Sequence, residues 1–278
     1  GLFSEEDLKI LELISSQAGV SIENAILYKQ AIVQERIQQD LEIASEIQHL
    51  FLPKSIEKIK KVSIDTVYSP AEFIGGDYYD VIKIDNNRYG IIIMDISGHG
   101  SSAAIVMSVI SFVVHSVMRR IKDTAQLMNH LNESIFSRLH GEKYATGIFM
   151  IYDTVKEIFE YTNAGHSNIL LYSKKFNKIG ELAKRGMPIG INKDTVYTKE
   201  RFKFSKGDIL LLETDGLYET KNANEKMFSM ERVKKLLFNY RDKAVDEINR
   251  YIIADLNKFR GTLEQDDDIT LISLKKIE

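Results

Sequence analysis

The chain has 278 residues, of which 44% are hydrophobic and 28% are charged, so its composition is that of a globular protein with one large domain or one domain and an extra element. Its formal net charge of −3 gives it no basic field, which argues against nucleic acid as the main partner. It contains no cysteine, which excludes disulfides and cysteine-based metal or redox sites, so any metal must be bound by oxygen or imidazole ligands.

The N-terminal part of the chain has the pattern of a helix. Ser4 is a suitable N-cap, because acidic residues occupy the turn that follows it. After Gly19, neither glycine nor proline occurs until Pro53. Apolar residues recur at helical spacing in two stripes, Leu8, Leu11, Ile14 and Ala18, then Val33, Ile37, Leu41, Ala44, Ile47 and Phe51.

Two interpretations of this N-terminal region are open. A single helix of this length is too long for one small domain to bury, so it would form a coiled coil or dock as a signalling helix. Two amphipathic helices with a bend near Gly19 would instead be ordinary parts of a domain. We favour self-association, because a long amphipathic helix needs another surface to cover its apolar face.

From Val62 onward the hydrophobic pattern changes to that of strands. Apolar residues alternate or form short runs, and turn residues such as Asp-Asn-Asn at 85–87 separate them. Further strands are expected at residues 78–84, 88–96, 146–152, 157–163, 169–173, 201–204, 208–213 and 269–274, and helices at about residues 101–119, 123–139, 229–239 and 244–258. Because hairpins join most strands while the helices come in separate blocks, the pattern predicts an α+β fold of antiparallel sheets covered by helices.

The most apolar long stretch of the chain is residues 101–118. It contains several serines and His115, so we expect a buried core helix and no membrane span. The chain opens without the pattern of a signal peptide, and its first residue is Gly1, so we expect it to begin inside a longer protein. The absence of cysteine is compatible with a reducing cytosol, and we expect a cytoplasmic protein without a membrane partner in this part of the sequence.

Several aspartates stand where apolar strands meet glycine-rich turns. Asp77 follows Gly75 and Gly76, Asp95 follows an isoleucine-rich run, and Asp215 follows a leucine-rich run. The acidic run at residues 266–268 precedes the last strand. Each residue alone has an ordinary interpretation as a turn residue, but a buried carboxylate is costly unless it is paired or binds a metal. Together the aspartates predict an all-oxygen site, which favours Mg²⁺ or Mn²⁺.

Six short motifs in a fixed order carry a resemblance to a known family. They are GGDYYD at residues 75–80, DISGHG at 95–100, NAGH at 163–166, GMPIG at 186–190, TDGLYE at 214–219 and DDITL at 267–271. In this order they resemble the bacterial PPM-type (PP2C-like) serine/threonine phosphatases of the RsbU and SpoIIE group. The resemblance implies an αββα sandwich of two antiparallel sheets flanked by helices, with a long helix or coiled coil added at the N-terminus.

The resemblance also divides the chain into three parts. Residues 1–30, with Glu-Asp-Leu at 6–8 and Ile-Glu-Asn-Ala at 22–25, resemble the C-terminal helix of a truncated GAF sensor domain. Residues 31–55, with LEIASEIQ at 41–48, resemble the helical linker that precedes this kind of phosphatase, and we expect a coiled coil there. Residues 56–278 are then the phosphatase domain.

The resemblance implies two divalent metal ions, Mn²⁺ or Mg²⁺, and a water nucleophile without a covalent enzyme intermediate. Asp95 is expected to bridge both ions, and the backbone carbonyl of Ile96 to complete one coordination shell. Asp215 and Asp267 are expected on the second ion, and Asp77 on the first, directly or through water. Of Asp267 and Asp268, Asp268 is the less certain ligand. Its alternative role is to hold the turn of the last strand.

Histidines and basic residues are the other candidates near the site. His99 is a candidate catalytic residue beside Asp95 and Asp215, because the ordinary pKa of histidine suits proton donation to the leaving oxygen at neutral pH, although it could simply belong to a tight turn that opens the next helix. His166 is expected to shape a turn near the site. No arginine between Ile64 and Asp77 matches the one that grips phosphate in eukaryotic PP2C enzymes, so metals and waters are expected to hold the phosphate.

The implied function is hydrolysis of phosphoserine or phosphothreonine on a regulatory protein, commonly a STAS-type anti-sigma-factor antagonist. Activity would be controlled through the N-terminal helices, which would pair two chains into a homodimer. Lys184 and Arg185 could contact the phosphoprotein, although isolated basic residues are usually surface charges. Two alternatives remain: a catalytically weak scaffold of the same fold that binds a signalling partner, and a metal-dependent esterase for small phosphoesters.

Overall fold

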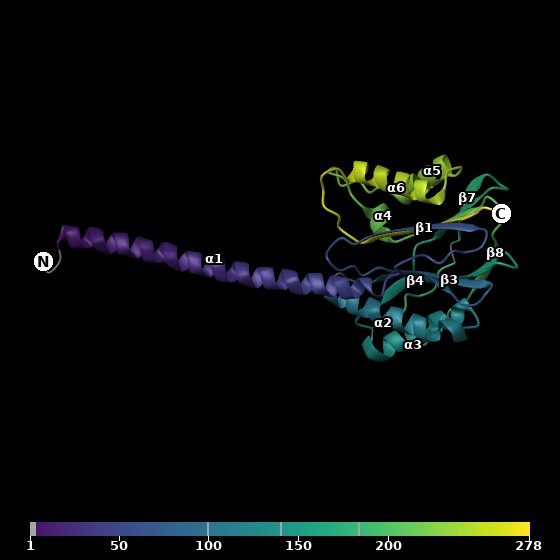
Figure 1. The fold of residues 1–278 in the computed structure, drawn as a ribbon, viewed down its shortest axis with the longest axis horizontal. Helices are drawn as coiled ribbons and strands as arrows, with labels where there is room; N and C mark the ends of the chain where they lie inside the picture. The colour runs from purple at the N-terminus through teal and green to yellow at the C-terminus, as the bar shows by residue number, and fades with distance from the viewer. Residues whose placement is uncertain (1–3, 99, 140, 183) are drawn as a thin grey trace. The chain divides into compact units, whose positions relative to one another are not determined.

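The structure is a computed structural model that describes residues 4–98, 100–139, 141–182 and 184–278 (Figure 1). The chain divides into two compact units, Gly1–Glu46 and Ile47–Glu278. His99, one of the expected catalytic residues, lies outside the described residues. The predicted boundaries at residues 30 and 55, and the GAF origin of the first segment, stay predictions.

The first unit consists of helix α1 (Glu5–His49), whose last residues extend into the second unit. Ser4 caps this helix as predicted: its Oγ accepts a hydrogen bond from the Asp7 backbone N–H at 3.2 Å, and Asp7 Oδ2 accepts one from the Ser4 N–H at 2.8 Å. The helix continues through Gly19, so of the two interpretations the structure has the single helix. Its apolar side chains are exposed, including Leu11 and Leu13.

The second unit contains two five-stranded sheets. Every strand pair in both sheets is antiparallel, as predicted. One sheet has the order β1 (Val62–Ser69), β10 (Ile269–Lys276), β9 (Ile209–Glu213), β6 (Ile169–Ser173) and β7 (Lys178–Leu182). The other has the order β2 (Tyr78–Lys83), β3 (Arg88–Ile96), β4 (Ala145–Asp153), β5 (Ile158–Ala164) and β8 (Glu200–Lys203).

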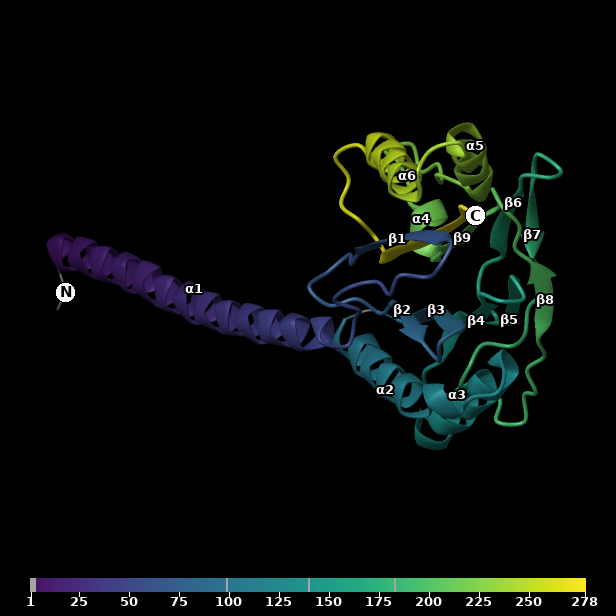
Figure 2. The same cartoon turned by 45° about the vertical axis from the view of Figure 1, so that its right-hand side comes forward.

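Helices cover the outer face of each sheet, so the second unit has four layers (Figures 1 and 2). On the sheet that contains β3 lie α2 (Ser101–Val117), the 3₁₀ turn η1 (Met118–Arg120) and α3 (Thr124–Leu139). On the sheet that contains β9 lie α4 (Asp215–Glu219), α5 (Met230–Tyr240) and α6 (Val245–Arg260). This arrangement confirms the expected αββα sandwich.

Strand β9 is buried on both of its faces. Its side chains alternate between two hydrophobic clusters: Leu210 and Leu212 pack between the sheets, while Ile209 and Leu211 pack under α5 and α6. Because both faces are covered, the strand is a continuous apolar run and every one of its residues is buried. The end of such a strand is held rigidly, which fixes the residues that follow it.

Helix α2 is the apolar stretch noted in the sequence. By length and composition alone, residues Ser102–Arg120 would suffice to cross a membrane. In this fold Ala103, Met107, Ile110 and Val114 recur on one face and have no exposed surface. That face packs in the cluster formed with β3, β4 and α3, so α2 is the core helix that the sequence predicted.

Two elements were not predicted from the sequence. Strand β7 is an edge strand with no buried residue, so it lacks the apolar alternation that marks a half-buried strand. Helix α4 has only five residues, too few for a helical period to be recognised. The remaining elements lie where expected, with ends that differ by one or two residues.

Candidate active site

Asp77 stands at the entrance to β2 and is 2% exposed. Its Oδ2 accepts hydrogen bonds from the Thr214 hydroxyl at 2.8 Å and the Thr270 hydroxyl at 2.5 Å. Thr270 lies in β10 of the other sheet and Thr214 directly follows β9 of that sheet, so this carboxylate joins the two sheets at one end of the sandwich. Burial raises the pKa of Asp77 well above its usual value, and the negative charge of Asp95 raises it further.

Asp95 is the next-to-last residue of β3 and lies opposite Thr146 of β4. Burial is the main cause that raises the pKa of Asp95 to about 7, and the negative charges of Asp215, Asp267 and Asp268 contribute to this value. Three further carboxylates are therefore close enough for their charge to act on Asp95.

Asp215 is the first residue of α4, directly after β9. Burial raises its pKa, and the charge of Glu219 adds to this. Asp95 and Asp215 come from different sheets and line one cavity of about 120 Å³. The other residues that line it are Thr146, Gly165, His166, Ser167, Arg185 and Tyr218.

Asp267 and Asp268 differ in what they contact. The Asp268 carboxylate accepts hydrogen bonds from the backbone N–H groups of Ala71 at 2.8 Å and Gly76 at 2.5 Å. It thereby holds the loop before Asp77, whereas its expected alternative role was to hold the turn of its own strand. Asp267 is exposed, and its Oδ1 accepts a hydrogen bond from the Asp268 N–H at 2.8 Å.

Gly76 lets this loop pass close to the end of β3. A Cβ atom on Gly76 would lie 3.1 Å from the backbone oxygen of Ile96 and 3.3 Å from the Cβ of Ala103. Ile96 is the residue whose carbonyl was expected to bind a metal, and its side chain is buried. The close approach explains why the motif has glycine at this position.

His166 is held by hydrogen bonds on both ring nitrogens. Its Nε2–H donates to the backbone oxygen of Glu213 at 3.0 Å, and the Thr146 hydroxyl donates to Nδ1 at 2.8 Å. Its backbone N–H donates to Asn163 Oδ1 at 2.8 Å. Burial lowers the pKa of His166 to about 4, so the ring is neutral at pH 7. These contacts give His166 the turn-shaping position that the sequence predicted.

Gln48 is a residue of the site region that sequence reasoning missed. It is buried at the end of α1, and its Nε2–H donates to the backbone oxygen of Gly75 at 2.5 Å. Its Oε1 accepts from the Gly75 N–H at 3.1 Å. The side-chain amide thus pairs with the backbone two residues before Asp77. Gln48 is the buried residue of α1, and its sequence context gives no sign of this burial.

The aspartates fit a divalent cation by their chemistry. Among the described residues, the charges that act on Asp77, Asp95 and Asp215 are all negative. Buried carboxylates that repel one another favour a positive ion between them. As they stand, however, no three His, Asp or Glu side chains in the described part of the chain are gathered closely enough to hold a metal ion.

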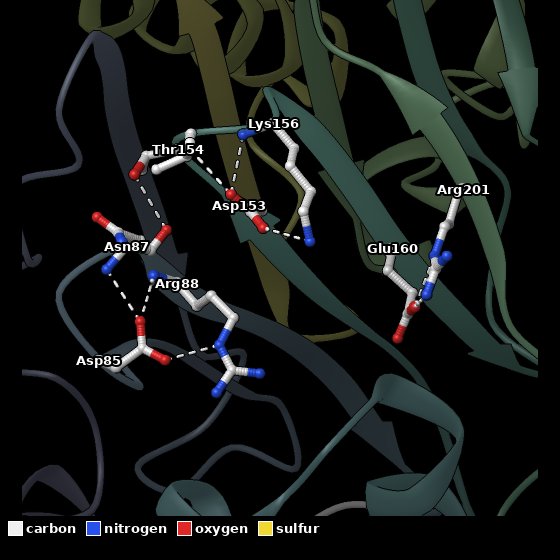
Figure 3. A network of polar contacts seen from close by, with 9 residues as sticks. Asp85, Asn87, Arg88, Asp153, Thr154, Lys156, Glu160 and Arg201 are labelled. Carbon is white, nitrogen blue, oxygen red and sulfur yellow. Dashed lines mark hydrogen bonds and ion pairs between the residues drawn. The ribbon is translucent and has the colours of Figure 1, made fainter.

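A second group of acidic residues lies at the opposite end of β3 and on neighbouring strands (Figure 3). Here Asp85 pairs with Arg88 at 2.7 Å, and Glu160 pairs with Arg201 at 2.6 Å. The backbone N–H of Asn87 lowers the pKa of Asp85, with Arg88 contributing. We call Asp85, Arg88, Asp153, Lys156, Glu160 and Arg201 the paired cluster. Its carboxylates have cationic partners, so nothing in it calls for a metal.

Comparison with known proteins identifies the family. The chain matches the family described as Stage II sporulation protein E (SpoIIE) over residues 85–276, which is more than half of its length. The chain belongs to the SpoIIE family. This confirms the resemblance read from the six motifs.

Two phosphatases of Bacillus subtilis (strain 168) are similar to this SpoIIE-family chain in sequence. The chain is 28% identical over 244 residues to phosphoserine phosphatase RsbU, and the match covers 88% of this chain and 72% of RsbU. It is 28% identical over 240 residues to phosphoserine phosphatase RsbP, covering 83% of this chain and 56% of RsbP. The chain therefore spans little more than half of the RsbP sequence.

Solved structures show the same fold. The SiaA-PP2C domain of Pseudomonas aeruginosa superposes with a TM-score of 0.77 at 20% identity, covering 87% of this chain and 98% of that domain. RsbX in complex with magnesium superposes with a TM-score of 0.60 at 18% identity, covering 79% of this chain and 98% of RsbX. The chain thus has the PP2C fold, and its family and relatives make it a serine/threonine protein phosphatase.

Proposed function

We propose that this chain removes phosphate from phosphoserine or phosphothreonine on a regulatory protein, using two divalent metal ions, Mn²⁺ or Mg²⁺. The observation that carries the proposal is the cavity in which Asp95 and Asp215 meet, surrounded by further carboxylates whose charges add to theirs. The complex of RsbX with magnesium supports a hard divalent ion, because RsbX shares this fold.

Each expected ligand has a part that the contacts support. Asp95, at the end of β3, would bind the ions together with the backbone carbonyl of Ile96. Asp215 and Asp267 would hold the second ion, and Asp77, oriented by Thr214 and Thr270, would act on the first. Asp268 would serve mainly by holding the loop that carries Asp77. Since these carboxylates are not yet gathered into a complete ligand set, binding would draw them closer.

When bound, the two ions would supply the positive charge that lowers the pKa of a water and offsets charge on the phosphoryl group. The chain's own residues shape the place where this happens. His166 and Thr146 fix one wall of the cavity through their mutual hydrogen bond. The two threonines hold Asp77 in one orientation, which limits the reorganisation needed during the reaction.

The size of the cavity favours a protein substrate. Its volume of about 120 Å³ admits a phosphoryl group on a side chain but little more. Pockets that enclose a whole small-molecule ligand usually measure about 300 Å³ or more. We therefore favour a phosphorylated regulatory protein, of the STAS type by analogy with the resembled group, over a small phosphoester. A cytoplasmic location agrees with such a substrate.

Control through the N-terminal helix is the second part of the proposal. Helix α1 exposes apolar residues along its length, and pairing with a second copy of the chain would cover them. Its last turn carries Gln48, which contacts the loop before Asp77. A truncation that begins near residue 55 should therefore lose both dimerisation and regulated activity. Full activity with the same oligomeric state would contradict this part.

Phosphate release from phosphoserine substrates, measured with and without Mn²⁺, tests the enzymatic proposal. Asp95→Asn and Asp215→Asn should each lower the rate by at least about 100-fold, because each removes a metal-binding charge. Asp153→Asn, a carboxylate of the paired cluster, is the matched control and should leave the rate unchanged. Unchanged rates in both site variants would refute the metal assignment, and no release by the wild type would favour the scaffold alternative.

A further inference from the structure

The cavity that contains Asp95 and Asp215 also contains an arginine. Arg185 lines it, three residues after the end of β7. His166 is neutral because burial lowers its pKa to about 4, so Arg185 is the positively charged member of the lining at pH 7. From the sequence, Arg185 had an ordinary interpretation as a surface charge. The residue is indeed exposed, but it also lines the cavity, which gives it a second possible role.

The guanidinium group of Arg185 is anchored on one side. Its Nε–H donates a hydrogen bond to Asn168 Oδ1 at 2.9 Å. Asn168 Nδ2 in turn donates to Glu181 Oε2 at 2.5 Å, and Glu181 pairs with Lys234 at 2.7 Å. This chain of contacts fixes the direction of the arginine. Within the described residues, no acceptor is recorded for its Nη1 and Nη2 groups, which leaves both of them for a ligand.

The charge of Arg185 acts on the groups around the cavity. Burial is the main reason for the low pKa of His166, and the positive charge of Arg185 lowers it further. Burial also raises the pKa of Tyr218, and Arg185 acts in the opposite direction. Both effects agree with the position of Arg185, which lines the same cavity as His166 and Tyr218.

A phosphoryl group needs such a donor here. A phosphate monoester carries negative charge, and the carboxylates of the cavity would repel it. Metal ions would offset the carboxylates, but a guanidinium adds directed N–H groups whose geometry matches phosphate oxygens. We propose that Arg185 binds the phosphoryl oxygens of the substrate and so takes the part of the arginine that is missing near the first acidic motif. This inference rests on the proposed phosphatase function.

The neighbouring basic residues do not compete for this role. Lys184 forms an ion pair with Glu200, and it does not line the cavity. Lys143, near the loop after Asp95, donates to the backbone oxygen of Ser97 at 3.1 Å and also lies outside the lining. Lys184 therefore provides a matched control: it is the adjacent residue, it is exposed, and it carries the same charge.

The test uses the full chain, a phosphoserine peptide, and inorganic phosphate as a product inhibitor, at saturating Mn²⁺. Arg185→Ala should raise the KM for the peptide and the inhibition constant for phosphate by about 10- to 100-fold, the effect of losing charged hydrogen bonds. Arg185→Lys should recover part of the loss. Lys184→Ala should match the wild type, and the Mn²⁺ affinity of Arg185→Ala without substrate should be unchanged.

Asn168→Ala provides a second variant, because Asn168 positions Arg185 without lining the cavity. It should raise both constants by a smaller factor, and it should add nothing in the background of Arg185→Ala. If the wild type releases phosphate in a Mn²⁺-dependent way but Arg185→Ala keeps the wild-type KM and phosphate inhibition, the role of Arg185 is refuted and the phosphatase proposal stands. If the wild type releases no phosphate, both fail.

Discussion

Strand β3 connects two regions that treat acidic side chains in opposite ways. At its first residue, Arg88 belongs to the paired cluster, where Asp85 finds an arginine and several backbone N–H groups (Figure 3). At its other end, Asp95 lies near further carboxylates. Burial and the negative charges of these carboxylates together raise the pKa of Asp95 to about 7. At one end of the strand the carboxylates are paired with cations, and at the other end they lie near further carboxylates.

The difference teaches where function lies in this fold. Exposed ion pairs such as Asp85–Arg88 contribute little to stability, roughly 0–1 kcal/mol each, so such a pair can be replaced at small cost. Buried like charges reduce stability, so a protein that keeps them needs them for something else. The paired cluster has the commoner arrangement, and the group around Asp95 has the arrangement expected of a site that binds a cation.

Replacing Asp77 should lower activity as strongly as replacing Asp95 or Asp215. Asp77→Asn keeps the size of the side chain but removes the charge that two threonine hydroxyls orient. We expect phosphate release to fall by about 100-fold or more, with the folded structure retained. Steady-state kinetics with circular dichroism checks this, and Asp85→Asn serves as the control from the paired cluster. Equal activity of Asp77→Asn and Asp85→Asn would contradict the claim that the candidate site, and not the paired cluster, is needed for phosphate release.

Replacing Asp268 should affect stability and metal binding together. Asp268→Ala leaves the N–H groups of Ala71 and Gly76 without their acceptor. We expect a loss of about 3 kcal/mol in the free energy of unfolding and a roughly 10- to 100-fold loss of Mn²⁺ affinity. Urea unfolding and calorimetry measure the two effects. Full stability of this variant would show that the loop does not depend on the carboxylate.

Replacing Gln48 should have a smaller effect on stability. Gln48→Ala removes both hydrogen bonds to Gly75, at a cost of about 1–3 kcal/mol because the groups are buried. Activity should fall by about 10-fold, since the loop that carries Asp77 becomes less ordered. Gln38→Ala, on the exposed part of the same helix, should change neither quantity. If both variants behave alike, the end of α1 has no influence on the site.

Breaking a pair in the paired cluster should have the smallest effect. Arg88→Ala should reduce the free energy of unfolding by about 0.5 kcal/mol, because the pair is exposed. The pKa of Asp85 in the folded protein lies below its ordinary value of 3.8, so the stabilisation is present above that pH and is lost as the pH falls through the folded pKa. The difference between variant and wild type should therefore shrink as the pH falls below 3.8. A constant difference down to pH 2 would contradict the ion-pair explanation.

The sequence predicted those features that depend on local pattern. Strand β3 was expected at residues 88–96 and is found there, because a turn sequence precedes a long apolar run. The convergence of Asp95 and Asp215 followed from their positions at strand ends. Features that depend on tertiary contacts could not be predicted. The edge strand β7 has no buried face, and periodicity could not decide whether α1 continues through Gly19.

The same limit applies to residues around the site. Thr214 was expected to shape the backbone at Asp215, but its hydroxyl also orients Asp77 from the other sheet. Arg185 stands next to the motif at 186–190, and only the fold shows that this loop reaches the cavity. Both roles come from contacts between sheets or loops far apart in the sequence, which a single sequence does not record.

Calorimetric titration of Mn²⁺ into the wild type, Asp95→Asn and Asp153→Asn tests the central claim most directly. The two aspartates lie on adjacent strands of one sheet, one in the candidate site and one in the paired cluster. We predict that the wild type and Asp153→Asn bind two equivalents of Mn²⁺ with similar affinity, and that Asp95→Asn loses this binding. Equal binding by all three proteins would contradict the claim that the carboxylates at the end of β3 form the metal site.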